Sequence, residues 1–391
     1  MLLSTLLSLT LALTGSAVSA ASIPETDYDV IVVGGGPAGL SVLSGLSRVR
    51  RKTALFDSHQ YRNDPTREMH DVIGNDGTPP AEFRGAAREQ ISTYPTATFI
   101  DNAITSITPL NTTTNSSTTT LFLATDSTGA EYTARKIVLA TGLVDVLPAN
   151  TPGLVEAFGK GIFWCPWCDG YEHRDQPLGI LGTLPHVVST ITEIATLNSD
   201  VIAFVNGSYT EQEVSALETS NPVWRAQVEA YNVQIDNRTI VSIDRLQDGG
   251  EVTNEAGDQQ IDIFQINFTE GEPVIRNAFM TNYDTAQRSS LPYELGLAMS
   301  DGKIDTSINP GMRTSLAGVF AIGDANSDGS TNVPHAMFSG KRAAVYGHVE
   351  LAREEMAAAI SKRSLSTRAL QKEAERIMGD EMERIWERVK A

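Results

Sequence analysis

Cysteine and histidine are scarce in this chain of 391 residues, which holds two of the former and six of the latter. Two cysteines cannot build a disulfide framework or a cysteine-rich zinc site, and no histidine stands in a recognisable ligand spacing, so we expect no metal. Basic residues are also few: 30 Lys and Arg face 48 Asp and Glu, which gives a formal charge of −18. This balance argues against nucleic acid and anionic membrane surfaces as partners.

Long apolar runs are absent beyond the N-terminus, so the sequence offers no transmembrane helix. Residues 1–20 carry no charge, their apolar run is too short to span a bilayer, and Val18-Ser19-Ala20 supplies the small side chains of a cleavage site. This pattern predicts a signal peptide and a protein that is secreted or lies in the lumen of the secretory pathway. A buried helix and a wrongly assigned start codon are the alternatives.

Sequons for N-glycosylation are slightly more frequent than chance gives, which favours a glycoprotein. They begin at Asn111, Asn115, Asn206, Asn237 and Asn267. The first two lie in a Thr/Ser-rich run, residues 111–120, which predicts an exposed hairpin tip.

The length suits two globular domains at roughly 150 residues each, and the first begins with a dinucleotide-binding pattern. An apolar, β-branched run over 28–33 enters a glycine turn containing Gly34, Gly36 and Gly39, and helical spacing follows. A second strand, 53–56, ends at Asp57, at the distance where a carboxylate reaches an adenosine ribose. The glycines allow the backbone to approach a pyrophosphate at a helix N-terminus. The alternative is a glycine-rich turn without a ligand.

Two later strands belong to the same predicted site. Residues 136–142 end in Ala-Thr-Gly with Thr141 and Gly142, and residues 318–324 end in Gly323 and Asp324. A carboxylate at the end of a strand can accept hydrogen bonds from cofactor hydroxyls. Because these strands lie far apart in the sequence, we expect a domain that the chain leaves and re-enters.

A second strand–helix–strand unit, over residues 178–205, repeats the first weakly. Its turn keeps Gly182 but places Thr183, Leu184 and Pro185 where phosphate should meet bare backbone. No Arg or Lys follows the next strand before Tyr209 to hold a 2′-phosphate. We therefore expect the scaffold of a nicotinamide site without its chemistry; the alternative is a divergent site that still works.

Both cysteines fall in one motif, Cys165-Pro166-Trp167-Cys168-Asp169. A C-x-x-C pair beside such a unit is typical of a redox dithiol, and Asp169 can move a proton to or from a departing thiolate. A structural disulfide and half of a metal site are the alternatives. A flavin beside this pair is the economical explanation, because flavins exchange two electrons with dithiols.

The tail, residues 341–391, has helical spacing with one apolar face. Packing on its own domain and contact with a second copy are the two interpretations.

In their order, the glycine turn, Ala140-Thr141-Gly142, the C-x-x-C motif and residues 318–324 resemble the low-molecular-weight thioredoxin reductase family. The resemblance covers about residues 27–350. It implies an α/β fold of two Rossmann-like domains, the second inserted into the first. We expect the FAD-binding domain over 27–148 and 277–391, and the inserted C-x-x-C domain over 149–276.

Residues 57–63 and 332–336, with the altered second turn, resemble the fungal branch of FAD-dependent dithiol oxidases of the gliotoxin and holomycin type. That resemblance implies a homodimer and a Cys165–Cys168 redox pair. It implies FAD contacts at Gly34, Gly36, Gly39, Asp57, Thr141 and Asp324; Gly142 and Gly323 stand beside the last two.

We expect a flavoprotein thiol oxidase that closes a disulfide in a small dithiol or a protein thiol and passes the electrons to O2, giving H2O2. Asp169 and His335 are the candidate proton carriers. The rival hypotheses are an NADPH-dependent disulfide reductase and a flavin-binding protein without turnover.

Overall fold

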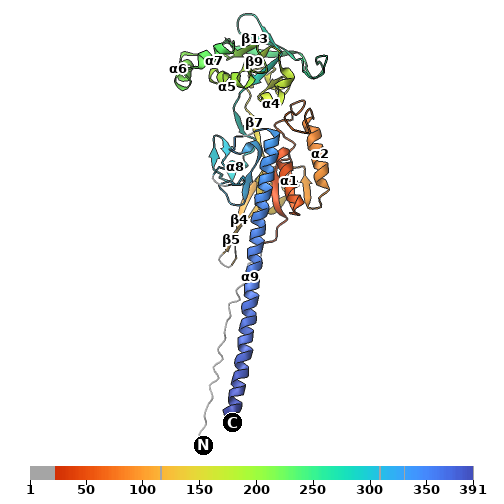
Figure 1. Cartoon of the computed structure of the whole chain (residues 1–391), viewed down its shortest axis with the longest axis vertical. Helices are drawn as coiled ribbons and strands as arrows, with labels where there is room; N and C mark the ends of the chain where they lie inside the picture. Colours follow the sequence, from red (N-terminus) through yellow and green to blue (C-terminus); the bar gives the residue numbers. More distant parts are fainter. Residues whose placement is uncertain (1–22, 115–116, 308–309, 330, 391) are drawn as a thin grey trace.

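The computed structural model describes residues 23–114, 117–307, 310–329 and 331–390. It consists of two α/β lobes, one above the other, and one very long helix that runs along the first lobe and continues beyond it (Figure 1). The predicted signal peptide, residues 1–20, and the sequon at Asn115 lie outside the described residues.

A seven-stranded sheet forms the first lobe, in the order β3-β2-β1-β6-β5-β4, with β19 paired to β6. The strands β3, β2, β1, β6 and β19 run parallel, whereas β4, β5 and β6 form an antiparallel meander. Their bounds are β1 (Tyr28–Val33), β2 (Thr53–Phe56), β3 (Ala97–Ile100), β4 (Ile104–Thr114), β5 (Ser117–Asp126), β6 (Glu131–Leu139) and β19 (Val319–Ala321). Because β4 and β5 pair up to Thr114 and Ser117, the predicted hairpin is confirmed.

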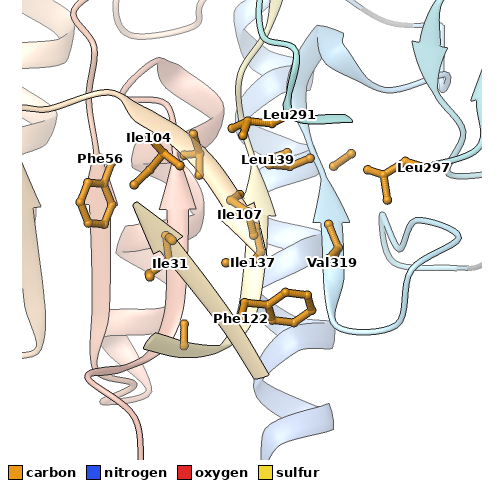
Figure 2. Packing of buried hydrophobic residues seen from close by; sticks show 14 of the residues in the cluster. Ile31, Phe56, Ile104, Ile107, Phe122, Ile137, Leu139, Leu291, Leu297 and Val319 are labelled. Carbon is orange, nitrogen blue, oxygen red and sulfur yellow. The ribbon is translucent and has the colours of Figure 1, made fainter. Parts of the chain in front are cut away.

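The sheet of the first lobe is apolar on both faces because both are covered. Val30 and Val32 of β1 face a cluster with the helices α1 and α9, whereas Ile31 faces the other side. There Phe122 and Leu291 complete a core of side chains from β1, β2, β4, β5 and β6 (Figure 2). The smaller elements of this lobe are α1 (Pro37–Arg48), α2 (Pro80–Ser92), α8 (Leu291–Glu294), β17 (Met299–Ser300), β18 (Lys303–Ile304) and η2 (Gly323–Ala325).

A five-stranded parallel sheet, in the order β11-β10-β9-β15-β8, forms the second lobe. Its strands are β8 (Ile162–Phe163), β9 (Leu178–Leu181), β10 (Val201–Phe204), β11 (Gln234–Asp236) and β15 (Ala278–Thr281). Since β15 pairs with β9 along its whole length, the second lobe extends past residue 276, where we expected the inserted domain to end. The helices are α3 (Leu154–Ala157), α4 (Pro166–Asp169), η1 (Tyr171–His173), α5 (Leu184–Ile194), α6 (Glu211–Ser220) and α7 (Trp224–Ala230).

Two antiparallel elements complete the second lobe and its connection. A three-stranded sheet contains β12 (Ile240–Gln247), β13 (Ile263–Phe268) and β14 (Val274–Arg276). The chain enters the second lobe through β7 (Leu143–Asp145) and leaves it through β16 (Thr285–Gln287), and these two strands pair with each other. The lobes are therefore joined by a paired ribbon rather than by single loose strands.

The helix α9 (Val333–Lys390) is one continuous element of 58 residues. Its first part buries Ala343, Ala344 and Leu351 against the first lobe. The rest projects past that lobe and does not fold back on it (Figure 1). On this part of the helix, Met356 and Ile360 are each 61% exposed. The expected homodimer remains a prediction. Within the described residues, the helices are too short or too polar to cross a bilayer.

A loop of the first lobe, residues 57–79 between β2 and α2, reaches across to the second lobe. Arg67 donates from Nη2 to Asp262 Oδ1 at 2.9 Å and from Nη1 to Asp262 Oδ2 at 3.0 Å, and it also contacts Asp248. Asp262 is fully buried, and His173 Nε2 lies 3.2 Å from its Oδ2. Although burial opposes the charge, the hydrogen bonds from His173 and Arg67 lower the pKa of Asp262 to about 2.

We predict that Asp262→Ala destabilises the protein by about 3 kcal/mol, because it removes the buried carboxylate that Arg67 and His173 share and leaves Arg67 with Asp248 alone as its anion. The folded pKa lies below the unfolded one, so the stabilisation is present above about pH 4 and is lost as the pH falls toward 2. Denaturant unfolding of the holoprotein at pH 7 and at acidic pH measures both effects. Asp258→Ala, which removes an exposed partner of Arg174, is the control and should cost less than about 1 kcal/mol. Equal losses in the two variants would contradict the prediction.

Candidate functional site: a dinucleotide cavity beside a disulfide

The glycine turn after β1 opens a cavity of about 490 Å3 that Gly34 and Gly36 line. Gly34 has φ +116°, and a Cβ there would lie 2.2 Å from the carbonyl oxygen of Ala140. A Cβ on Gly39 would lie 1.9 Å from the Gly34 oxygen, so Gly39 shapes the turn from outside the cavity. At Gly36 a Cβ would meet nothing within 4 Å. This space at the start of α1 fits the close approach of a pyrophosphate.

The two later strand ends meet at the same cavity. Thr141, Gly142, Gly323 and Asp324 all line it. Gly142 and Gly323 have φ values of +69° and +71°, which explains the glycines. The buried hydroxyl oxygen of Thr141 has no hydrogen-bond partner within the protein. Because buried polar atoms are nearly always paired, this oxygen fits a contact to the cofactor.

Asp57, the expected ribose ligand, does not line the cavity. Its buried carboxylate lies beneath Gly35 and accepts hydrogen bonds from three groups of the chain itself. These are the Tyr61 hydroxyl at 2.7 Å, Arg88 Nη1 at 3.1 Å and the backbone N–H of His59 at 2.9 Å. Burial and the hydrogen bond to Asp57 raise the pKa of Tyr61. In this structure Asp57 holds the loop that follows β2.

Arg62, which stands in the motif 57–63 without a role assigned from the sequence, joins the cavity to the C-x-x-C motif. It donates to Asp324 at 3.0 Å and to both oxygens of Asp145, at 2.6 and 3.0 Å. Its guanidinium lies 4.3 Å from the centre of the Trp164 ring. Despite the opposing effect of burial, the contacts with Asp145 and Asp324 raise the pKa of Arg62. Arg62 therefore connects the cavity wall, the ribbon between the lobes and the residue before Cys165.

Cys165 and Cys168 form a disulfide with 5.2 Å between their Cα atoms. Cys165 is the N-cap residue of α4, and its side chain is buried, with 7% exposed. Cys168 lines a second cavity of about 80 Å3. Both cavities share part of their walls, namely Arg62, Asn63, Trp164, Asn332 and Val333. The disulfide is thus beside a cavity that shares a wall with the dinucleotide cavity, and Cys168 is the cysteine that lines it.

Asp169 also lines the second cavity. Burial raises the pKa of its carboxyl to about 6, and a hydrogen bond from Thr66 Oγ1 at 2.9 Å acts in the opposite direction. A carboxyl with this pKa can both accept and release a proton near neutral pH. Its position directly after Cys168 suits the predicted exchange with a departing thiolate.

His335, the second proposed proton carrier, lines neither cavity. Its Nε2 lies 2.7 Å from Asp328 Oδ2, and its backbone N–H donates to the side chain of Asn332 at the start of α9. A structural role at this helix terminus accounts for these contacts. The histidine that does line the cavity with Cys168 is His70, and no motif identified it in the sequence.

The corresponding turn of the second lobe is closed. At the start of α5, Leu184 is fully buried and its backbone N–H donates to Ser208 Oγ at 3.0 Å, while Pro185 has no N–H to offer. After β10, Asn206 Oδ1 accepts a hydrogen bond from the backbone N–H of Ile240, and the backbone N–H of Tyr209 donates to Asn237 Oδ1. The amides and the loop that would hold a nucleotide phosphate and ribose are engaged with the protein itself.

Known proteins resemble this chain along most of its length. The family model described as pyridine nucleotide-disulphide oxidoreductase matches residues 28–340. A protein of Arthroderma benhamiae named probable thioredoxin reductase is 51% identical over 374 residues, covering 93% of this chain and 92% of the relative. The thioredoxin reductase tcpT of Claviceps purpurea is 32% identical over 80% of this chain and 90% of its own. The crystal structure of HlmI superimposes with a TM-score of 0.73 at 27% identity, over 87% of this chain and 97% of HlmI.

We predict that Gly36→Ala weakens FAD binding at least about tenfold, equivalent to about 1.4 kcal/mol, because the new methyl group occupies the space where backbone meets pyrophosphate. The backbone of Gly36, with φ −71°, accommodates alanine, so the fold should persist. FAD retention after extensive dilution, followed by absorbance, measures the effect. Gly85→Ala in α2 is the matched control, since a Cβ there also meets nothing but lies outside the cavity. Equal retention in both variants would contradict the assignment.

Proposed function

The chain belongs to the pyridine nucleotide-disulphide oxidoreductase family, and from this premise we propose that it is an FAD-dependent thiol oxidase with O2 as electron acceptor. It is a thioredoxin reductase-like flavoprotein that acts on sulfur groups. The proposal adds the direction of electron flow: a dithiol substrate is oxidised to a disulfide, and O2 is reduced to H2O2. The substrate is a small dithiol or a protein thiol.

The observation that carries this proposal is the closed turn at the start of α5. A nicotinamide nucleotide needs free amides for its phosphates, and here the Leu184 amide binds Ser208 while Pro185 provides none. No cation follows β10 before Tyr209 to pair with a 2′-phosphate. The redox disulfide, in contrast, lies beside an intact dinucleotide cavity.

The residues of the chain divide the proposed chemistry among them. A substrate thiolate attacks Cys165, the S–S bond breaks, and Cys168 leaves as a thiolate. A second substrate thiolate displaces Cys165, which closes the substrate disulfide and leaves the enzyme dithiol. Asp169 exchanges the proton at Cys168. When bound, FAD accepts the electron pair and delivers it to O2.

The predicted compartment favours the same direction. If the predicted signal peptide directs secretion, the enzyme works where O2 is plentiful and disulfides persist. A reductase that depends on NADPH would lack its reductant there. The signal peptide, glycosylation and secretion remain predictions.

A second candidate function is an NADPH-dependent disulfide reductase. It is favoured by the names of the relatives, which include thioredoxin reductase tcpT, and by the retained strand–helix–strand scaffold of β9, α5 and β10. A flavin-binding protein without turnover is the remaining alternative, and it requires an inert disulfide.

We predict that, without oxygen, a dithiol bleaches the flavin and micromolar NADPH does not. Admitting O2 should then restore the colour and release H2O2. Stopped-flow absorbance with a peroxide assay measures both halves. Rapid bleaching by NADPH would overturn the proposal in favour of the reductase, and no bleaching by any dithiol would favour the inert flavoprotein.

We also predict that Cys165→Ser and Cys168→Ser each abolish dithiol oxidation while FAD stays bound, because the chain has no third cysteine. Cys165→Ser leaves Cys168 as a thiolate in the cavity that adjoins the dinucleotide cavity, so a long-wavelength charge-transfer band should appear. Cys168→Ser should lack that band. Turnover retained by either single variant would show that the disulfide is structural.

A further inference from the structure

A group of titratable side chains surrounds His70 beside the disulfide. His70 belongs to the loop 57–79 and lines the same cavity as Cys168 and Asp169. Its Nε2 lies 3.6 Å from Glu172 Oε1 and 3.7 Å from Glu68 Oε2. On the other side of the ring, Nδ1 lies 3.6 Å from Asp76 Oδ1.

The exposure of these groups increases outward. The side chains of His70 and Glu172 are 14% and 13% exposed, whereas those of Glu68 and Asp76 are 45% and 70% exposed. Nε2 thus faces both the mostly buried Glu172 and the more exposed Glu68, whereas Nδ1 faces the exposed Asp76. The ring therefore lies between the cavity with Cys168 and carboxylates that reach solvent.

Two buried polar atoms of this group lack a hydrogen bond. His70 Nε2 and Glu172 Oε2 are buried and make no hydrogen bond within the protein. Buried polar atoms usually find a partner, and the cavity of about 80 Å3, although mostly apolar, has the polar side chains of Thr66, His70 and Asp169 in its wall, which is where a water molecule would bind. Water in this cavity would connect Nε2 with Asp169.

Proton balance requires a path for one proton from the enzyme dithiol to solvent. Oxidation of the enzyme dithiol releases two electrons and two protons. A flavin takes both electrons but only one proton at neutral pH, so the second proton must reach solvent. Asp169 is the group next to Cys168 that can accept it, and its partly buried carboxyl lies in the cavity wall, bonded to Thr66.

We propose that His70 relays this proton from Asp169 to solvent each time the Cys165–Cys168 dithiol is oxidised. The proton arrives at Nε2 through cavity water, and the proton on Nδ1 leaves toward Asp76. Glu172 positions the ring from η1, and Glu68 offers a second exit. Imidazole suits this role because it exchanges protons near neutral pH. The inference rests on the proposed oxidation of dithiols.

The test compares His70→Ala with His186→Ala, a control on α5 whose ring contacts Thr183. Dithiothreitol reduces each FAD-loaded protein anaerobically in weak buffer. Flavin absorbance follows the electrons, and a pH indicator follows the proton released. His70→Ala should slow both signals roughly 100-fold, and His186→Ala should match the wild type.

Rescue distinguishes a relay from a structural role. Added imidazole should restore most of the rate in His70→Ala, because a small base can enter the vacated space, and raising the buffer concentration should help in the same way. The wild type should respond to neither. His70→Gln, which keeps the volume of the side chain, should be slow without rescue and should retain FAD. His70→Ala as fast as the wild type in weak buffer, or His70→Ala that is slow and that no base restores, would overturn the relay.

Failure of the proposed function gives a different pattern. If NADPH rather than the dithiol bleaches the wild-type flavin, the oxidase proposal fails. The relay then has to deliver a proton inward as the disulfide is reduced. The rate at which Cys168 becomes available to an alkylating reagent would test it, with the same expected loss in His70→Ala and the same rescue by imidazole.

Discussion

One buried anion determines how the redox disulfide meets the cofactor cavity. Asp262 binds Arg67 of the first lobe and His173 of the second. The other ring nitrogen of His173 lies 2.9 Å from the backbone oxygen of Asp169. The short helix that carries Cys168 is thereby tied to the loop that carries Thr66 and His70. Without this carboxylate, the cavity between them would lose its fixed walls. The geometry of the proposed chemistry therefore depends on an interaction outside the site itself.

The parts of the site that lie on strand ends could be predicted from the sequence. Gly34, Thr141 and Asp324 follow β1, β6 and β19, which are neighbours in one parallel sheet, so local patterns were enough to bring them together. Asp57 has the right spacing for a ribose contact, but spacing does not reveal which groups will compete for a carboxylate. In the folded protein, Tyr61 and Arg88 donate hydrogen bonds to the Asp57 carboxylate.

The contacts of the loop 57–79 could not be predicted from local sequence patterns. It has no period of 2 or 3.6, and its contacts span large sequence distances: Arg62 binds Asp324, and Arg67 binds Asp262. His335, in contrast, stood in a short motif and proved to lie at a helix terminus with Asp328. Two signals were available in the loop: the motif 57–63 contains Arg62, and Arg67 and His70 lie close to it in a chain poor in basic residues.

The closed turn at Leu184 and the contacts between the lobes are consistent with each other. A second lobe that delivered electrons from a nicotinamide would have to present that group to the flavin as well as the disulfide. The contacts of Arg62 with Trp164 and of Arg67 with Asp262 hold the second lobe so that Cys168 lines the cavity beside the dinucleotide cavity. In an enzyme whose electrons enter only through the disulfide, this fixed arrangement has no functional penalty. It also keeps Asp169 and His70 in the wall of one cavity, which is the geometry that the proposed proton route requires.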